Sequence, residues 1–391
     1  MNDLIIAAGI YLAALVILLV FAFRLPVAGD QVQEFEMLAL SLRENRVLRD
    51  TGLLSACLLS VSLPYAIVKL LRIPMEVAFR LAPCLSSALC PAMSYLIARL
   101  YLAPPPAIVC ALIATSSFYF CFYPNNGRMA LGIGFTSLLY YAILTGNLPL
   151  SLIAVLLVLF SHYATILYNL IIIAPALAVM ILTGMSGAYP LLIIFTLALA
   201  AAVFWFEFFQ RQARDIIHQV VSNSVNYFMS RLKLQRLVVA PDYLYTPALS
   251  VDRLISARRF PQRFEMASGL MLAGLMVLGA ASLPGSIPSL YLLLALSSLG
   301  VIALSLANPV ISNMSGVVRA YATSLPVLAP LAVFGMRTLA GLAGWNQGAA
   351  FTLLIFLILG QIIAVSGILH FFYGWDKRSR REINRLSQEL N

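Results

Sequence analysis

Long apolar runs alternate with short polar turns along most of the chain. An apolar run of about 20 residues is long enough to cross the hydrocarbon core of a bilayer as a helix. The pattern therefore predicts an all-α, polytopic transmembrane helical bundle of about 11 spans. The predicted spans are 4–23, 77–101, 106–123, 128–145, 148–163, 166–184, 188–208, 265–283, 287–306, 318–342 and 350–373.

Polar segments divide this pattern into parts. A polar first loop at 24–50 contains a cluster of acidic residues. Residues 51–74 are moderately apolar but diluted by polar side chains and Pro64, which predicts juxtamembrane helices lying in the interface instead of a span. The expected parts are a membrane module at 1–209 that includes this loop and these helices, an insertion at 210–263, C-terminal membrane helices at 264–374 and a charged, exposed helical tail at 375–391.

Composition agrees with a membrane protein. Hydrophobic residues make up 62% of the chain and charged residues 10%, with a mean hydropathy of +0.94, whereas soluble domains carry about 25% charge. All five cysteines lie inside apolar runs, which indicates core residues and no disulfide framework or zinc site. No nucleotide-binding glycine pattern stands in a strand-turn-helix context, and the basic residues lack a compact soluble domain that could bind nucleic acid.

The predicted topology gathers the polar groups on one face of the membrane. With residues 51–74 on the surface, every Lys and Arg except Arg99 and Arg337 falls on the face that also receives the acidic loop. The opposite face receives short, nearly uncharged turns. Any chemistry is therefore expected on the first face.

Acidic residues follow the first span directly. A helix starting near Asp30 would put Asp30 and Glu34 on one face, one turn apart, with Glu36 nearby. Two such carboxylates can bind a divalent cation or accept a proton from a hydroxyl group. The same spacing also fits a solvated helix start with Asp30 as its N-cap.

Three further polar sites interrupt apolar helices on that face. Arg128 follows a glycine turn at the start of a span, where it could hold a phosphate or extend to the interface. His162 stands where a helix begins, as a site residue or a hydrogen-bonded interface histidine. Arg319 with Tyr321 could form a second anion-binding point or a polar helix cap.

The insertion is basic and partly amphipathic. Residues 216–239 mix apolar and polar side chains at helical spacing, which predicts a surface helix. Its basic residues fit attraction to anionic membrane lipids, or a roof over a groove that binds a lipid phosphate.

The order of these features resembles the GT-C superfamily of integral membrane glycosyltransferases, in its archaeal type that uses polyprenyl-phosphate-linked sugars. The likeness covers roughly residues 1–340. It rests on Asp30-Gln31-Val32-Gln33-Glu34-Phe35, Asn126-Gly127-Arg128-Met129, Ser161-His162-Tyr163-Ala164-Thr165 and Arg319-Ala320-Tyr321. Gly29 stands where such enzymes usually carry a second aspartate.

The resemblance implies a GT-C-like bundle and an inverting transfer of a hexose or pentose from a polyprenyl-phosphate-linked donor. The acceptor would be a hydroxyl group of a glycan, lipid or protein. Asp30 would be the base, with Glu34 orienting the acceptor or, together with Asp30, an Mg²⁺ or Mn²⁺ ion. The implied donor-phosphate residues are Arg128, Arg319, His162 and Tyr321, and the implied acceptor residues are Gln33, Glu36 and Tyr163.

Two alternatives stay open. A transporter or flippase of a lipid-linked anion could use the same arginines, but it would place polar groups near the bilayer midplane; a purely structural membrane subunit would need no such cluster. The positive-inside rule puts the basic face in the cytoplasm, whereas the resemblance puts the active site on the extracytoplasmic side of the cell membrane. We expect the extracytoplasmic side, because a face that handles phosphate has its own reason to be basic.

Overall fold

The structure is a computed structural model, and it describes residues 2–24, 30–47, 57–116, 127–231, 260–283, 285, 287–307 and 317–373. Every regular element in these ranges is an α-helix, as the sequence predicted. Eight helices in the same ranges are long and apolar enough to cross a membrane, as expected for an integral membrane protein. They cover Asn2–Phe23, Met75–Arg99, Gly127–Leu144, Tyr163–Leu182, Ala188–Phe208, Ser289–Ala307, Arg319–Leu342 and Gln347–Ala364.

The other three predicted spans correspond to shorter described helices. These are α6 (Pro104–Thr115), α9 (Leu148–Ser161) and the apolar part of α14, Ala267–Ala281. The predicted span 106–123 continues past Ser116 into residues outside the described ranges. Besides α6 and α9, the described helices have the following full bounds: α1 (Asn2–Arg24), α2 (Asp30–Arg43), α3 (Leu58–Leu71), α4 (Met75–Ser87), α5 (Leu89–Arg99), α8 (Gly127–Leu144), α10 (Tyr163–Leu182), α11 (Ala188–Phe209), α12 (Arg211–Arg231), α14 (Phe260–Ala281), α15 (Ser289–Ala307), α17 (Val317–Leu342) and α18 (Gln347–Tyr373).

The predicted span 77–101 is interrupted at Ala88, between α4 and α5. Pro91 has no amide N–H to donate to the carbonyl of Ser87, so the helical hydrogen-bond ladder is broken at this point.

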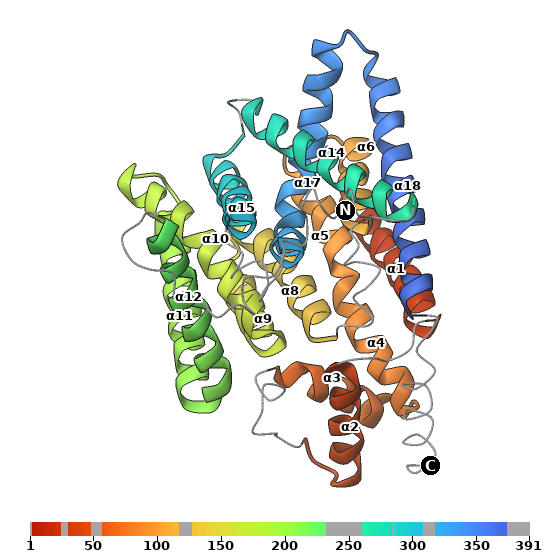
Figure 1. Cartoon of the computed structure of the whole chain (residues 1–391), viewed down its shortest axis with the longest axis vertical. Helices are drawn as coiled ribbons and strands as arrows, with labels where there is room; N and C mark the ends of the chain where they lie inside the picture. Colours follow the sequence, from red (N-terminus) through yellow and green to blue (C-terminus); the bar gives the residue numbers. More distant parts are fainter. Residues whose placement is uncertain are drawn as a thin grey trace.

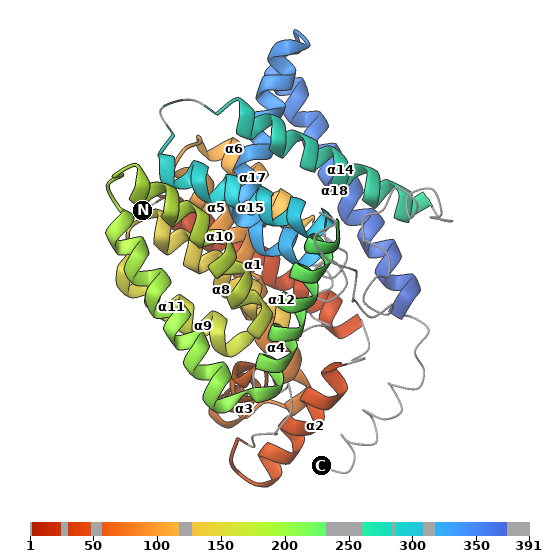
Figure 2. The ribbon, with the colours of Figure 1, turned by 60° about the vertical axis from the view of Figure 1, so that its left-hand side comes forward.

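One end of the molecule is closed by α2 and α3. They lie together below the ends of α4, α8 and α9, with α3 crosswise to α4 (Figures 1 and 2). One short helix therefore occupies the described part of 51–74, where the sequence predicted one or two interfacial helices. The predicted surface helix of the insertion begins earlier than expected: α12 starts at Arg211 and packs on α11. Residues 232–259 and the predicted helical tail lie outside the described ranges.

Close backbone contact joins α14 to α17, which cross in Figure 1. A Cβ atom added at Gly279 would lie 1.9 Å from the carbonyl oxygen of Leu331, and one added at Gly335 would lie 1.9 Å from that of Leu275. Only glycine allows this reciprocal approach, a common device where membrane helices pack.

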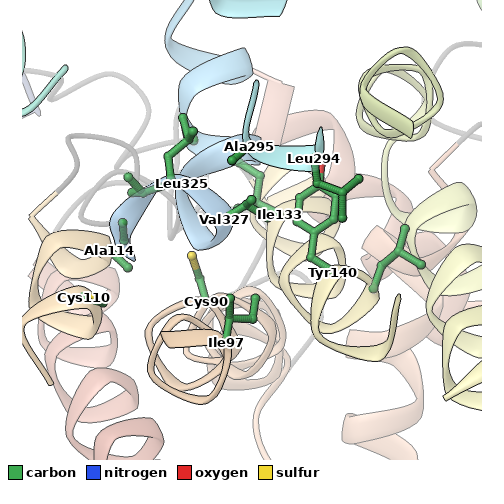
Figure 3. Packing of buried hydrophobic residues seen from close by; sticks show 14 of the residues in the cluster. Cys90, Ile97, Cys110, Ala114, Ile133, Tyr140, Leu294, Ala295, Leu325 and Val327 are labelled. Atoms are coloured by element: carbon green, nitrogen blue, oxygen red, sulfur yellow. The ribbon is translucent and has the colours of Figure 1, made fainter. Parts of the chain in front are cut away.

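The apolar core forms where α5, α6, α8, α15 and α17 meet. Figure 3 shows side chains of these helices together, among them Ile97, Ile133, Leu294 and Leu325. Cys90 and Cys110 are part of this cluster, and the thiols of Cys57 and Cys84 are also free and buried. The prediction of core cysteines is confirmed for these four, and Cys121 lies outside the described residues.

Arginines fasten both ends of α1. Near its start, Asp3 accepts hydrogen bonds from Arg99 Nε at 2.7 Å and from the Tyr95 hydroxyl at 3.0 Å. Near its end, buried Arg80 of α4 donates to the carbonyl of Ala22 and forms an ion pair with Glu76 at 2.9 Å. The chain therefore leaves the first span at a fixed point, from which it leads to α2.

Candidate functional site

The site begins with the amphipathic pattern of α2. Gln31, Glu34, Phe35 and Leu38 are buried, at the i, i+3, i+4, i+7 spacing of one helix face. Phe35 packs edge-to-face on Phe79 of α4, with ring centroids 5.3 Å apart. These apolar contacts fix the rotation of α2 and turn Glu34 toward the bundle.

Glu34 forms an ion pair with Arg128 at the start of α8. Arg128 Nε lies 2.5 Å from Glu34 Oε1, and the two side chains are 10% and 2% exposed. Removing one partner of a charge pair this deeply buried is costly, because the remaining charge would be left in a poorly solvated position. The first acidic segment and the middle of the chain therefore meet at the same end of the bundle.

Glycines on α8 make room for this arrangement. A Cβ atom added at Gly127 would lie 3.1 Å from Glu34 Oε2, so the residue before Arg128 has to be small for the carboxylate to approach. One turn further on, a Cβ atom at Gly132 would lie 2.8 Å from Thr165 Oγ1 and 3.1 Å from His162 Cβ. The first turns of α8 therefore touch both Glu34 and the start of α10.

His162 separates α9 from α10 as a single extended residue with φ −158° and ψ 115°. It is the N-cap of α10: its Nδ1 accepts from the backbone N–H of Thr165 at 3.3 Å and lies 2.9 Å from Thr165 Oγ1. Its ring stacks on Tyr163, with centroids 5.2 Å apart. The buried histidine therefore has one ring nitrogen engaged by the helix that it caps.

Arg319, in the first turn of α17, acts electrostatically on His162. Burial, followed by the positive charges of Arg319 and Arg128, holds the pKa of His162 well below its usual value. His162 stands between the apolar helix Leu148–Ser161 and the membrane-spanning helix Tyr163–Leu182, and its lowered pKa leaves the ring neutral near pH 7. Helix α17, which carries Arg319, packs against α8, which carries Arg128, and against α10, which His162 caps.

Cys57, at the N-cap of α3, adds a fourth element. Burial raises the pKa of its thiol to about 11, while Arg128 and then Glu34 act on it electrostatically in opposite directions. The thiol is protonated at neutral pH and therefore packs as a small core group. Its position beside the ion pair brings α3 to the same site.

The structure separates the predicted site residues into two groups. Glu34, Arg128, His162 and Arg319 come together, whereas Gln33 and Glu36 are exposed on α2, off the face that carries Glu34. Their exposure follows from the helical phase set by the buried Phe35 and Leu38, and their role as acceptor residues stays a prediction. Tyr163 is half-buried beside His162, and half-buried Tyr321 packs against the main core. Asp30 begins α2 one turn before Glu34, and its side chain lies outside the described part.

Three neighbours were missed by the sequence reasoning. Gln31 is buried with its Nε2 near the start of α8, Cys57 flanks the ion pair, and Thr165 holds the His162 ring. Gln31 could have been found, because it stands three residues before Glu34 and thus on the same helix face. Nothing in the sequence indicated the contact of Cys57.

The electrostatics of the cluster favour an anion. Three helices, α8, α10 and α17, begin here, with Arg128, His162 and Arg319 in or beside their first turns. Each helix start carries a partial positive charge of about half an elementary unit and several unused N–H donors. The described side chains of the cluster include two arginines, Arg128 and Arg319, and one carboxylate, that of Glu34.

A metal site is less well supported by the described side chains. Within the described ranges, no group of three or more His, Cys, Asp or Glu residues is placed to hold a metal ion. Glu34, one of the two predicted ligands, is engaged by Arg128. The predicted Mg²⁺ or Mn²⁺ site at Asp30 and Glu34 stays a prediction, because the Asp30 side chain lies outside the described part.

No protein-family model matches the sequence, and a comparison with curated proteins gives no match. Function is therefore inferred from the site itself.

Proposed function

We propose that the chain is a membrane glycosyltransferase that transfers a sugar from a polyprenyl-phosphate-linked donor to an acceptor hydroxyl group, with inversion at the anomeric carbon. The observation that carries the proposal is the Glu34–Arg128 ion pair. It holds the acidic helix that follows the first span against the positively charged end of the bundle. A base and an anion site would then adjoin each other beside the lipid.

Asp30 is the base in this proposal. As the acceptor oxygen bonds to the anomeric carbon, its proton passes to the Asp30 carboxylate, and the bond from the anomeric carbon to the phosphate oxygen breaks. The electron pair of that bond stays on the polyprenyl phosphate, which leaves with one more negative charge. Glu34 is held in an ion pair, which leaves Asp30 as the carboxylate of this turn that accepts the proton.

The positive end of the bundle supports the departure of the phosphate. Fixed cations and helix N–H groups stabilise developing charge best where water is scarce. The ionisable groups of this cluster stand in or beside the first turns of α8, α10 and α17 and not midway along these helices, which favours an enzyme over a transporter.

The test is sugar transfer by purified full-length protein in liposomes that contain polyprenyl-phosphate-linked sugars. Asp30→Asn is expected to abolish transfer while the protein folds as the wild type does. Glu44→Gln is the matched control, because Glu44 is an exposed carboxylate just after α2. Transfer by Asp30→Asn at the wild-type rate would reject Asp30 as the base.

The same liposomes test the alternative of a transporter. Movement of the intact lipid-linked sugar between leaflets, without transfer to any acceptor, would replace the enzyme by a flippase. In that case Asp30→Asn is not expected to change the rate, provided that the arginine cluster is intact.

A further inference from the structure

Arg337 is a cation at the end of the bundle opposite to the candidate site. It lies on α17, about 27 Å along the helix from Arg319 at a rise of about 1.5 Å per residue. The turn between α17 and α18 projects at this end, whereas α2 and α3 close the other end (Figures 1 and 2). The hydroxyl groups of Thr338 and Ser282 lie 2.7 Å apart, so Arg337 is level with the end of α14. It therefore stands near the membrane surface on the side away from the proposed chemistry.

Arg337 is half-buried but lacks a counter-charge. Its Nε is buried without a hydrogen-bond partner, and its guanidinium group forms no ion pair with the residues that the structure describes. The guanidinium carbon lies 5.7 Å from the centre of the Phe351 ring on α18. This contact attracts a cation but does not neutralise it. A charge in such surroundings normally has a partner of opposite sign.

The chain itself does not supply that partner. In the described part of this end, the carboxylate is that of Asp3, and Arg99 Nε already donates to its Oδ1 at 2.7 Å. No Asp or Glu occurs in the connecting segments at this end, which are 100–106, 145–149, 183–187, 282–288 and 343–346. The counter-charge of Arg337 is therefore expected from outside the chain.

The surroundings of Arg337 fit a lipid headgroup. Trp345 is exposed in the turn after α17, and tryptophan is typical of the membrane–water interface. Further along α18, Phe356 and Ile363 are exposed, so acyl chains below the headgroup would meet apolar side chains. A zwitterionic headgroup brings a cation of its own, for which the described part of this end has no unpaired carboxylate. An acidic headgroup brings only the negative charge that Arg337 lacks.

We propose that Arg337 binds the phosphate of an acidic phospholipid, such as phosphatidylglycerol, in the leaflet opposite the candidate site. The bound phosphate balances the charge of the guanidinium group beside Phe351 and so stabilises the packing of α17 on α18. The lipid is a structural ligand and no substrate. The site is therefore independent of the proposed sugar transfer.

The test uses a phosphatidylglycerol with a photoactivatable group in its acyl chain next to the headgroup. The full chain is labelled in non-ionic detergent micelles, and the labelled peptides are identified by mass spectrometry. The probe is expected on peptides from the end of α17 and the start of α18. Unlabelled phosphatidylglycerol should displace it at least tenfold more effectively than phosphatidylcholine, and inorganic phosphate at the same concentration should not displace it.

Variants then test the role of the arginine. Arg337→Gln is expected to weaken the labelling of these peptides about tenfold, because a charge-assisted hydrogen bond is lost, and Arg337→Lys should recover part of it. Arg214→Gln is the matched control, since Arg214 is a solvent-accessible arginine of α12. It should leave the labelling of α17 and α18 unchanged.

Each contrary result overturns a defined part of the proposal. Equal displacement by phosphatidylcholine would refute the preference for an acidic lipid, and displacement by inorganic phosphate would mean that the site takes a free anion. Labelling of Arg337→Gln at the wild-type level would refute the role of Arg337. If that variant does not fold, Arg337→Lys and the competition with wild-type protein decide the question. None of these measurements depends on sugar transfer, so a failure of the proposed function is seen separately.

Discussion

Breaking the Glu34–Arg128 pair on one side should destabilise the protein far more than replacing both partners together. Glu34→Gln removes one charge and keeps the shape and an acceptor oxygen. Arg128→Met removes the other charge and keeps much of the length. Each single variant leaves its partner as a lone charge in a site where both side chains are at most 10% exposed.

The expected size follows from burial and distance. At the observed 2.5 Å, the attraction of two unit charges is about 7 kcal/mol for an effective dielectric constant of about 20. Desolvation of both ions offsets much of this attraction, so the pair adds little over two neutral groups. Loss of a single partner should cost about 3–5 kcal/mol, and the double variant should cost clearly less than the sum. The coupling should therefore be at least about 2 kcal/mol.

The assay is reversible unfolding of the full chain in mixed micelles, followed by far-UV circular dichroism for the wild type, both single variants and the double variant. Arg214→Met is the matched control. Arg214 contacts Glu207 at 3.1 Å and Asp215 at 2.9 Å, but all three side chains are at least 32% exposed. Its loss should not change the midpoint measurably, because exposed ion pairs contribute little.

Strict additivity of the two single effects would refute this reasoning. Each residue would then contribute independently, and the ion pair would not be what fastens α2 to α8. A cost for Arg128→Met no larger than that of Arg214→Met would refute it as well.

Two further predictions concern packing and pH. Gly279→Ala should lower the free energy of unfolding by about 1–3 kcal/mol, and with it the thermal midpoint, because the added methyl group would overlap the carbonyl of Leu331. Gly274→Ala on the same helix is the control, since a Cβ atom there meets nothing within 4 Å. Equal midpoints for the two variants would contradict the close crossing of α14 and α17. The lowered pKa of His162 means that the unfolded chain takes up a proton below about pH 6.5 while the folded protein does not. The free energy of unfolding should therefore fall as the pH drops from about 7 to 5, by up to about 1.4 kcal/mol per pH unit. His162→Asn can still cap α10, and its thermal midpoint should depend less on pH than that of the wild type. The same pH dependence in both proteins would mean that His162 is readily protonated in the folded state.

Helix positions were largely predictable because each apolar run ends at turn residues. The predicted spans 128–145, 188–208 and 318–342 correspond closely to α8, α11 and α17. The count of spans was less predictable, since hydropathy does not reveal where an apolar helix stops short. Helix α9 covers only Leu148–Ser161, because His162 takes an extended conformation that begins a new helix.

The chemistry of the site was predictable in part. The sequence placed Glu34, Arg128, His162 and Arg319 on one face, and the structure brings these groups together. The sequence did not indicate which carboxylate would form the ion pair with Arg128, because that depends on how α2 is rotated about its axis. The rotation could have been inferred from Phe35 and Leu38, whose burial turns Glu34 inward and Glu36 outward.

The ion pair also bears on how the chain is threaded. If 51–74 crossed the membrane, Glu34 and Arg128 would lie on opposite sides of the bilayer, separated by a hydrocarbon core of about 30 Å. Their atoms are 2.5 Å apart. Helix α3 has 14 residues, and at about 1.5 Å per residue it is roughly 21 Å long, too short for a perpendicular span. It also contacts α2, α4, α8 and α9 at the end of the bundle. A helix that lies beside the membrane there keeps the acidic segment on the side where α8, α10 and α17 begin, and this shared side is the geometric condition for the proposed site.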